Sequence, residues 1–155
     1  MASKSSYFGL LLAAVLAGCS SDKASTSSRP SFDAAAIVGA ANWSDAETQN
    51  IVLSDYSFTP NNPVFKRNQT YQLHLENTST HTHTFGSDTF FQAIAVQDAQ
   101  VGGTDVPPEG LKNIELDPGQ AADISFVAVN PGTYGFYCDV FLHDTMGMDG
   151  KIVIQ

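Results

Sequence analysis

Three side chains that bind soft metal ions lie close together near the end of the chain. His143 follows Cys138 by five positions, and Met148 follows His143 by five more. A thiolate, an imidazole and a thioether are soft or borderline ligands. With one further imidazole they suit a copper ion that alternates between Cu(I) and Cu(II). The spacing therefore predicts a short loop between two strands that carries most of a redox metal site.

The further imidazole is available upstream, where a polar loop over residues 77–82 leads to His83. We expect His83 to be the second histidine ligand. His81 has the same strand parity and could lie near the site, as a surface residue, as a replacement for His83, or with His74 in an accessory metal site. His74 falls on the polar side of an alternating strand, so we expect it to face solvent.

Cys138 shares its strand parity with two aromatic residues, Tyr134 and Phe136. Alternate side chains of a strand point to the same face, so the thiolate is expected to point inward with the two rings. The other cysteine, Cys19, lies in a segment that predicts export. Only one cysteine then remains in the folded domain, which excludes a binuclear copper centre bridged by two thiolates.

The same residues carry a resemblance to a known family. The pattern Cys-x4-His-x4-Met ends in x-Gly-Lys and an aliphatic strand, and it follows GTYGFY at residues 132–137. Upstream, Asn77 and the segment HTF at residues 83–85 resemble the segment that supplies the family's first histidine. From about residue 49 to residue 155 the chain resembles the cupredoxins, specifically the plastocyanin-like small blue copper proteins. The resemblance implies an all-β Greek-key β-sandwich that holds one type 1 copper ion through His83, Cys138, His143 and Met148.

The chain departs from this pattern in the loop that carries the second histidine. Many relatives have Pro-Gly just before that histidine, where this chain has Phe141 and Leu142. The departure concerns the conformation of the loop and not the set of ligands. Met146 is an alternative axial ligand, because a shorter gap from histidine to methionine occurs in other cupredoxins. Met148 is favoured, since the ending Met-Asp-Gly-Lys resembles the plastocyanin-like one.

The resemblance also implies two routes by which an electron leaves the metal. One is the exposed edge of His143, which Val140, Phe141 and Leu142 would surround with an apolar patch suited to docking. The other runs through the cysteine ligand to its neighbour Tyr137, which has outward parity. Tyr137, Phe141 and Leu142 are therefore the candidate electron-transfer surface.

The chain is acidic, with a formal net charge of −9 at pH 7. Nucleic acid is disfavoured as a partner, because a phosphate backbone needs a basic surface. A basic redox protein such as a cytochrome c fits better, since opposite fields steer the encounter. Asp139, Asp144 and Asp149 either form part of this negative field or are ordinary solvated surface residues. We expect a monomer.

The N-terminus predicts export and lipid attachment. Residues 1–18 hold Lys4 and an apolar run of about a dozen residues, too short to span a bilayer, which is typical of a signal peptide. Leu-Ala-Gly before Cys19 resembles the bacterial lipobox, which implies a lipid on the Cys19 sulfur; cleavage by ordinary signal peptidase is the alternative. Residues 19–32 predict a flexible, lipid-anchored linker. Ser20 favours the outer over the inner membrane of a Gram-negative host, with the domain facing the periplasm or the exterior.

The remaining elements follow from local patterns. Residues 33–48 form an extension in which Asp33 would cap a helix over residues 34–38, and Ser44 with Glu47 would form a capping box. The domain itself begins at residue 49. The long connection over residues 86–110 predicts a short helix over 89–96 or an irregular insertion. Apolar alternation and turn residues predict strands over residues 51–58, 64–66, 70–76, 111–116, 121–129 and 133–138.

The leading functional hypothesis is a one-electron carrier in the bacterial envelope, and not an enzyme. The alternative is a periplasmic protein that stores or delivers copper, which would bind Cu(I) far better than Cu(II). A copper nitrite reductase is disfavoured, because such enzymes need a second cupredoxin domain and a further copper held by three histidines. Only His74 and His81 remain for that purpose.

Overall fold

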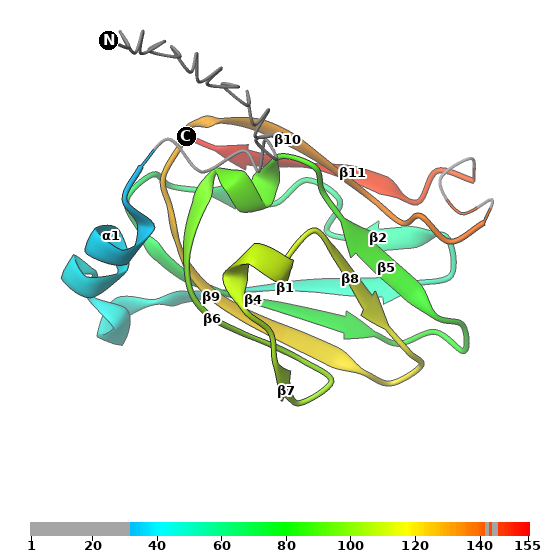
Figure 1. Ribbon diagram of the computed structural model, residues 1–155. Helices are drawn as coiled ribbons and strands as arrows, with labels where there is room; N and C mark the ends of the chain where they lie inside the picture. Colours follow the sequence, from blue (N-terminus) through cyan, green and yellow to red (C-terminus); the bar gives the residue numbers. More distant parts are fainter. Residues whose placement is uncertain (1–31, 142, 144–145) are drawn as a thin grey trace, which may run out of the picture.

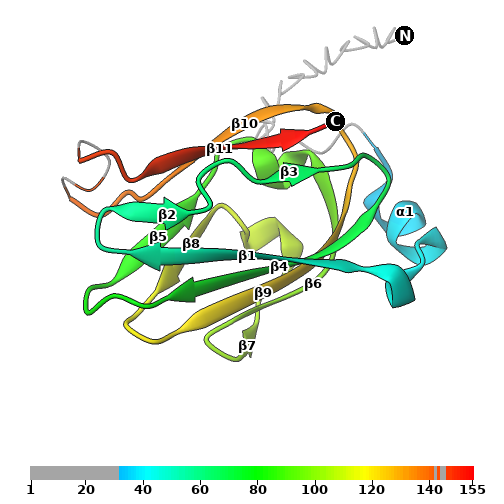
Figure 2. The same ribbon diagram turned by 180° about the vertical axis from the view of Figure 1, so that it is seen from behind.

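Two β-sheets packed face to face make up the body of the molecule (Figure 1, and from behind in Figure 2). The computed structural model describes residues 32–141, 143 and 146–155. The predicted all-β sandwich is confirmed. The larger sheet has the strand order β2 (Ser57–Thr59), β1 (Glu47–Ser54), β4 (Thr70–Asn77), β9 (Ala121–Ala128), β6 (Ile94–Val101) and β7 (Thr104–Asp105). The smaller sheet has the order β3 (Val64–Phe65), β11 (Asp149–Ile154), β10 (Gly132–Tyr137), β5 (His83–Gly86) and β8 (Asn113–Leu116).

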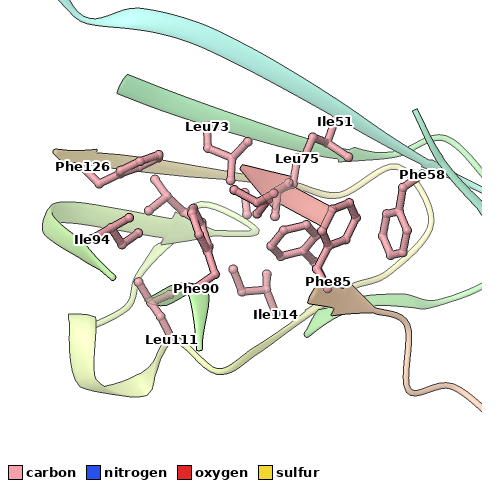
Figure 3. Packing of buried hydrophobic residues seen from close by; sticks show 14 of the residues in the cluster. Ile51, Phe58, Leu73, Leu75, Phe85, Phe90, Ile94, Leu111, Ile114 and Phe126 are labelled. Carbon is pink, nitrogen blue, oxygen red and sulfur yellow. The ribbon is translucent and has the colours of Figure 1, made fainter. Parts of the chain in front are cut away.

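The core lies between the two sheets and is rich in aromatic rings (Figure 3). In β4, Tyr71, Leu73 and Leu75 are buried, which confirms the half-buried strand predicted from their alternation. In the smaller sheet, Phe85 of β5 stacks on Phe136 of β10 with the ring centroids 4.9 Å apart. Because such cores are closely packed, these rings fix the two strands that carry the predicted metal ligands.

Residues 51–58 form a hairpin and not the single strand predicted from the sequence. β1 pairs antiparallel with β2, and Ser54 lies opposite Ser57. Asp55 and Tyr56 make the turn between them, and Tyr56 has a left-handed backbone conformation with φ of 61°. The prediction was wrong because this turn lacks the glycine or asparagine that usually marks a two-residue hairpin.

The connection over residues 86–110 contains two strands of the larger sheet. Within the segment predicted as a helix over residues 89–96, the helical part is a short 3₁₀ turn, η2 (Phe90–Gln92). The chain then enters β6, which pairs antiparallel with β9 along its length and with β7 at its end. A second 3₁₀ turn, η3 (Pro108–Gly110), precedes β8. The predicted helix is therefore wrong beyond this turn, because pairing with β9 outweighs the local preference.

The N-terminal extension is folded onto one end of the sandwich. Helix α1 (Ala34–Ala40) begins at the predicted cap, where the Asp33 carboxylate accepts the Ala36 backbone N–H at 3.1 Å. The predicted capping box of Ser44 and Glu47 is wrong, since a 3₁₀ turn, η1 (Trp43–Asp45), leads directly into β1.

Apolar residues of this extension pack on the outer side of the larger sheet. They are Phe32, Ala34, Ile37, Val38, Ala41 and Trp43, and they contact Ala95, Val127 and Val129. Figure 1 shows α1 at the opposite end of the sandwich from the β10–β11 connection. Among the helices that the structure describes, none has the length and apolar character needed to cross a membrane.

Candidate metal centre

The predicted ligands are brought together by the smaller sheet. His83 is the first residue of β5, and Cys138 directly follows the last residue of β10. The two strands pair antiparallel, with Gly86 opposite Tyr137. This pairing places the histidine near the cysteine although they are far apart in the sequence. The β10–β11 connection, at the end of the sandwich away from α1, adds His143 (Figure 1).

Three donor atoms from these residues converge. The Nδ1 atom of His83 lies 3.8 Å from the Cys138 sulfur, and the Nδ1 atom of His143 lies 3.6 Å from it. The two Nδ1 atoms are 3.2 Å apart. His83 and Cys138 are fully buried, whereas His143 is partly exposed. The three atoms form a closed triangle, and of these three residues His143 is the one that reaches solvent.

The triangle has the size that a three-coordinate metal site requires. A first-row metal ion such as zinc binds imidazole nitrogen at about 2.0 Å and thiolate sulfur at about 2.3 Å. Bonds of these lengths at 120° place the nitrogens about 3.5 Å apart and each nitrogen about 3.7 Å from the sulfur. The observed distances of 3.2, 3.6 and 3.8 Å are close to these values. Two imidazoles and a thiolate are also the donor set that blue-copper sites use. The residues therefore fit a copper ion.

Met148, and not Met146, lies in the interior beside this triangle. The Met148 side chain is fully buried, whereas Met146 is 58% exposed. The backbone N–H of Cys138 donates to the Met148 carbonyl at 3.0 Å, and the Met148 N–H donates to the His143 carbonyl at 3.0 Å. These bonds hold Met148 next to both ligands. The burial favours the predicted choice of Met148 over Met146, and the axial contact itself stays a prediction.

A polar link joins the two ligand strands at the sulfur. The Thr84 backbone N–H donates to the Cys138 sulfur at 3.4 Å. The Thr84 hydroxyl accepts the Asp139 backbone N–H at 2.8 Å and donates to the Asp139 carboxylate at 2.7 Å. The Asn113 side-chain amide donates to the other carboxylate oxygen. This Thr84–Asp139 link fixes the residue that follows His83 and the residue that follows Cys138. The Thr84 backbone N–H also stabilises a negative charge on the Cys138 sulfur.

Burial also prepares His83 for metal binding. Desolvation lowers the pKa of His83 below its ordinary value, the nearby His143 lowers it further, and Asp55 acts in the opposite direction. A metal ion binds the unprotonated imidazole and the deprotonated thiol. The lowered pKa means that protons compete less for the His83 ring as the pH falls.

The β1–β2 turn lies against both histidines, which the sequence did not predict. The Tyr56 ring meets the His143 ring edge to face, with centroids 5.1 Å apart and planes at 77°. One carboxylate oxygen of Asp55 lies 3.8 Å from the Nε2 atom of His83. Neither residue has a type or spacing that suggests a metal site, so only the folded hairpin shows that they belong to it.

The other two histidines lie outside the triangle. His81 has an exposed side chain whose Nδ1 atom lies 3.4 Å from the Asp55 carboxylate. His74 of β4 is half-buried, and its Nδ1 atom is hydrogen-bonded to the Asp123 carboxylate at 2.8 Å. The group of potential metal ligands contains His83 and neither of these. The arrangement favours His83 over His81 as the ligand, as predicted.

The predicted electron-transfer surface is described in part. Tyr137 is half-buried, and its hydroxyl donates to the Asp88 carboxylate at 3.2 Å. Phe141 is 85% exposed, whereas Phe85 and Phe136 are buried. Leu142, Asp144, the predicted lipidation residue Cys19 and residues 1–31 as a whole lie outside the described residues.

Comparison with known proteins identifies the family. A family model for the cupredoxin-like domain matches residues 9–154. The chain belongs to the cupredoxin-like family. This cupredoxin is 31% identical over 120 residues to a multicopper oxidase of Staphylococcus haemolyticus, and 32% identical over 113 residues to one of Staphylococcus aureus. Both alignments cover 68% of this chain and 25% of the oxidase, so the cupredoxin spans about a quarter of the length of these relatives.

Solved structures share the fold of this cupredoxin. Auracyanin B aligns with a TM-score of 0.50 and 18% identity, over 74% of this chain and 92% of its own. A multicopper oxidase from Pseudomonas Thermotolerans aligns with a TM-score of 0.54 and 19% identity, over 74% of this chain and 31% of its own. The cupredoxin sandwich thus occurs both as nearly a whole chain and as one part of a larger one, and the resemblance predicted from the sequence is confirmed.

The variant Thr84→Val tests whether the Thr84–Asp139 link stabilises the metal-free protein. Valine keeps the shape of threonine but leaves the partly buried Asp139 N–H without its acceptor. We expect the free energy of unfolding of the metal-free protein, measured by urea titration, to fall by about 1–3 kcal/mol. Thr82→Val is the matched control, because the Thr82 hydroxyl bonds Asp117 at the exposed surface. Its loss should be about 0.5 kcal/mol or less. Equal losses in both variants would contradict a special role for Thr84.

Proposed function

We propose that this cupredoxin is a one-electron carrier that holds a single type 1 copper ion. His83, Cys138 and His143 would bind the ion in a plane, and Met148 would be its weak axial ligand. The observation that carries the proposal is the triangle of two Nδ1 atoms and one sulfur, with distances of 3.2, 3.6 and 3.8 Å, in the interior of the sandwich. Membership of the cupredoxin-like family supports the choice of copper.

The arrangement of the ligands suits rapid electron transfer. Bound copper supplies a reversible couple between Cu(II) and Cu(I), which prefer different coordination geometries. The protein holds its three donor atoms at trigonal spacing, a geometry between the two preferences, so few atoms need to move when an electron arrives or leaves. The buried rings of Phe85 and Phe136 keep water away from the donor atoms and thereby influence the reduction potential.

The partner would approach the partly exposed edge of His143. Around this histidine the loop presents the exposed side chains of Phe141 and Met146, and the β1–β2 turn presents Tyr56. Exposed apolar residues grouped in this way are typical of a docking surface. The net charge of −9 adds an attraction for a basic protein, and we propose a basic redox protein such as a cytochrome c as the partner. Tyr137, bonded to Asp88, lies next to Cys138 and offers the second predicted route.

Oxidase chemistry is less well supported than electron transfer, although the curated relatives are named multicopper oxidases. An enzyme with several coppers needs additional groups of ligands. The histidines outside the triangle are His74, which is bonded to Asp123, and the exposed His81 beside Asp55. The residues next to Cys138 are Tyr137 and Asp139, which bond Asp88 and Thr84. We therefore propose a carrier, with copper storage or delivery as the alternative.

We further propose that the domain is tethered in the bacterial envelope by a lipid on Cys19. The support is the sequence before Cys19, which resembles a lipobox, and the polar linker of residues 19–32. The described fold begins at residue 32 with the extension that leads into α1. A tether that joins the chain there would enter at the end of the sandwich away from the β10–β11 connection (Figure 1), leaving His143 free to meet a partner.

The visible spectrum of the protein loaded with Cu(II) tests the proposed function. A short bond from the Cys138 thiolate to Cu(II) should give an intense blue colour that a reductant bleaches reversibly. Cys138→Ser should bind Cu(II) without this colour, because the alcohol cannot replace the thiolate. A colourless wild-type protein that binds Cu(I) much more tightly than Cu(II) would contradict the carrier and favour storage or delivery.

The two methionines provide a matched pair for the axial position. Met148→Leu should retain the blue colour and raise the reduction potential, because the weak axial donor that favours Cu(II) is lost. Met146→Leu is the control, since Met146 is exposed, and its potential should equal that of the wild type. The measurement is voltammetry of both variants. A shift in Met146→Leu with none in Met148→Leu would reverse the assignment.

Ionic strength tests the acidic steering of the partner. With a basic cytochrome c as the probe, the second-order rate of electron transfer should fall as salt screens the opposite charges. A small uncharged redox reagent serves as the control, and its rate should depend little on salt. Equal salt dependence for both reagents would remove the proposed attraction.

A further inference from the structure

The far side of the His83 ring presents an unusual polar atom. Its Nδ1 atom faces the cysteine and His143, and its Nε2 atom faces the β1–β2 turn. The ring is 0% exposed, and Nε2 has no hydrogen-bond partner among the described residues. An imidazole that binds metal through Nδ1 carries its proton on Nε2. In the metal-bound form this buried N–H group therefore needs an acceptor.

Asp55 is placed to be that acceptor. Its Oδ1 atom lies 3.8 Å from the His83 Nε2 atom, beyond the usual hydrogen-bond limit of about 3.2 Å. The Asp55 side chain is 55% exposed and lies on a turn, so its carboxylate is not held in place by core packing. The same oxygen lies 3.4 Å from the Nδ1 atom of His81. The carboxylate thus lies between the buried ring and an exposed one.

The turn that carries Asp55 is held against the metal centre by two further features. The hydroxyls of Ser54 and Ser57, which close the hairpin, are 2.8 Å apart and hydrogen-bonded. Tyr56 adopts a left-handed conformation, which a large side chain rarely adopts, and its ring contacts His143. Strained backbone of this kind persists where the surrounding structure requires it, commonly at functional sites. The turn therefore contacts both histidines of the triangle.

We propose that Asp55 is a positioning residue for the metal centre, whose carboxylate accepts the hydrogen bond from the Nε2–H group of His83. This inference rests on the proposed function in that His83 binds copper through Nδ1. The hydrogen bond fixes the tautomer that leaves the Nδ1 lone pair free, and it holds the ring in the plane of the triangle. A carboxylate acceptor also makes the imidazole a stronger donor.

A stronger imidazole donor favours Cu(II) over Cu(I), because the higher charge gains more from each donor. Asp55 therefore lowers the reduction potential of the centre. The hydrogen bond and the charge can be separated with two variants. Asp55→Asn keeps an oxygen that can accept the bond but removes the charge, whereas Asp55→Ala removes both.

The control variant is Glu47→Gln. Glu47 is exposed at the first position of β1, the strand that ends just before Asp55. An eight-residue strand places the two carboxylates roughly 25 Å apart. Glu47→Gln thus changes the net charge by the same amount as Asp55→Asn, on the same strand but far from the metal centre. Retention of the blue colour shows that each variant is folded with its ligands in place.

The first readout is the affinity for each oxidation state of copper. We expect Asp55→Ala to lower the affinity for Cu(II) by about 10–100-fold, the usual effect of removing the partner of a histidine ligand. The affinity for Cu(I) should fall less. Asp55→Asn should lower the ratio of the Cu(II) to the Cu(I) affinity by about tenfold, which corresponds to a rise of about 59 mV in potential. Glu47→Gln should leave both affinities at the wild-type values. Equal values for all variants would overturn the proposal while leaving the copper carrier intact.

The second readout needs no metal. Nitrogen NMR of the metal-free protein at pH 8 reports which ring nitrogen of His83 carries the proton. The wild type and Asp55→Asn should show the proton on Nε2, with slow exchange against water, and Asp55→Ala should show mixed tautomers or fast exchange. The same tautomer and exchange rate in all three proteins would overturn the role of Asp55. A wild type that gives the expected NMR result but no blue copper form would contradict the proposed function and not the hydrogen bond.

Discussion

The structure depends on one demanding constraint: two ring nitrogens and a sulfur must lie within 3.8 Å of one another without any covalent bond between them. Lone pairs that face each other across a dry interior repel, unless a proton or a cation lies between them. The protein must therefore supply the energy that holds the three atoms together. Closely packed aromatic rings and paired strands provide it, because they cannot shift without opening the core.

Support reaches the centre from three directions. The stack of Phe85 on Phe136 fixes β5 and β10 from the core side. The Thr84–Asp139 link joins the same two strands at their ends, directly at the sulfur. The β1–β2 turn closes the third side with contacts to His83 and His143. Among the three residues of the triangle, His143 is partly exposed, and this difference in burial is why we propose it both as a ligand and as the contact for a partner.

Sequence reasoning identified the residues of the candidate site because most of them lie on one segment of the chain. Cys138, His143 and Met148 lie on one short segment with regular spacing, and the burial of Cys138 follows from strand parity. Gly150 in the same segment was known only as part of a resemblance. The structure supplies its reason, because a Cβ atom there would overlap the Phe136 ring and lie 2.5 Å from the Asn61 carbonyl oxygen.

The parts that the sequence did not reveal depend on contacts between distant segments. Asp55 and Tyr56 reach the centre only because an unmarked hairpin folds back at that point. The sequence did not predict β6 as a strand, because its conformation depends on pairing with β9, which lies later in the chain. Nothing in the sequence marks Thr84, because its hydroxyl bonds Asp139, which lies across the folded sheet.

The most direct test of the account is a crystal structure of the copper-loaded protein with anomalous scattering measured at the copper edge. We predict a single strong peak at about 2.0 Å from the Nδ1 atoms of His83 and His143 and about 2.3 Å from the Cys138 sulfur. A peak bound elsewhere, for example at His74 and Asp123, or one that contacts His83 through Nε2, would contradict the account.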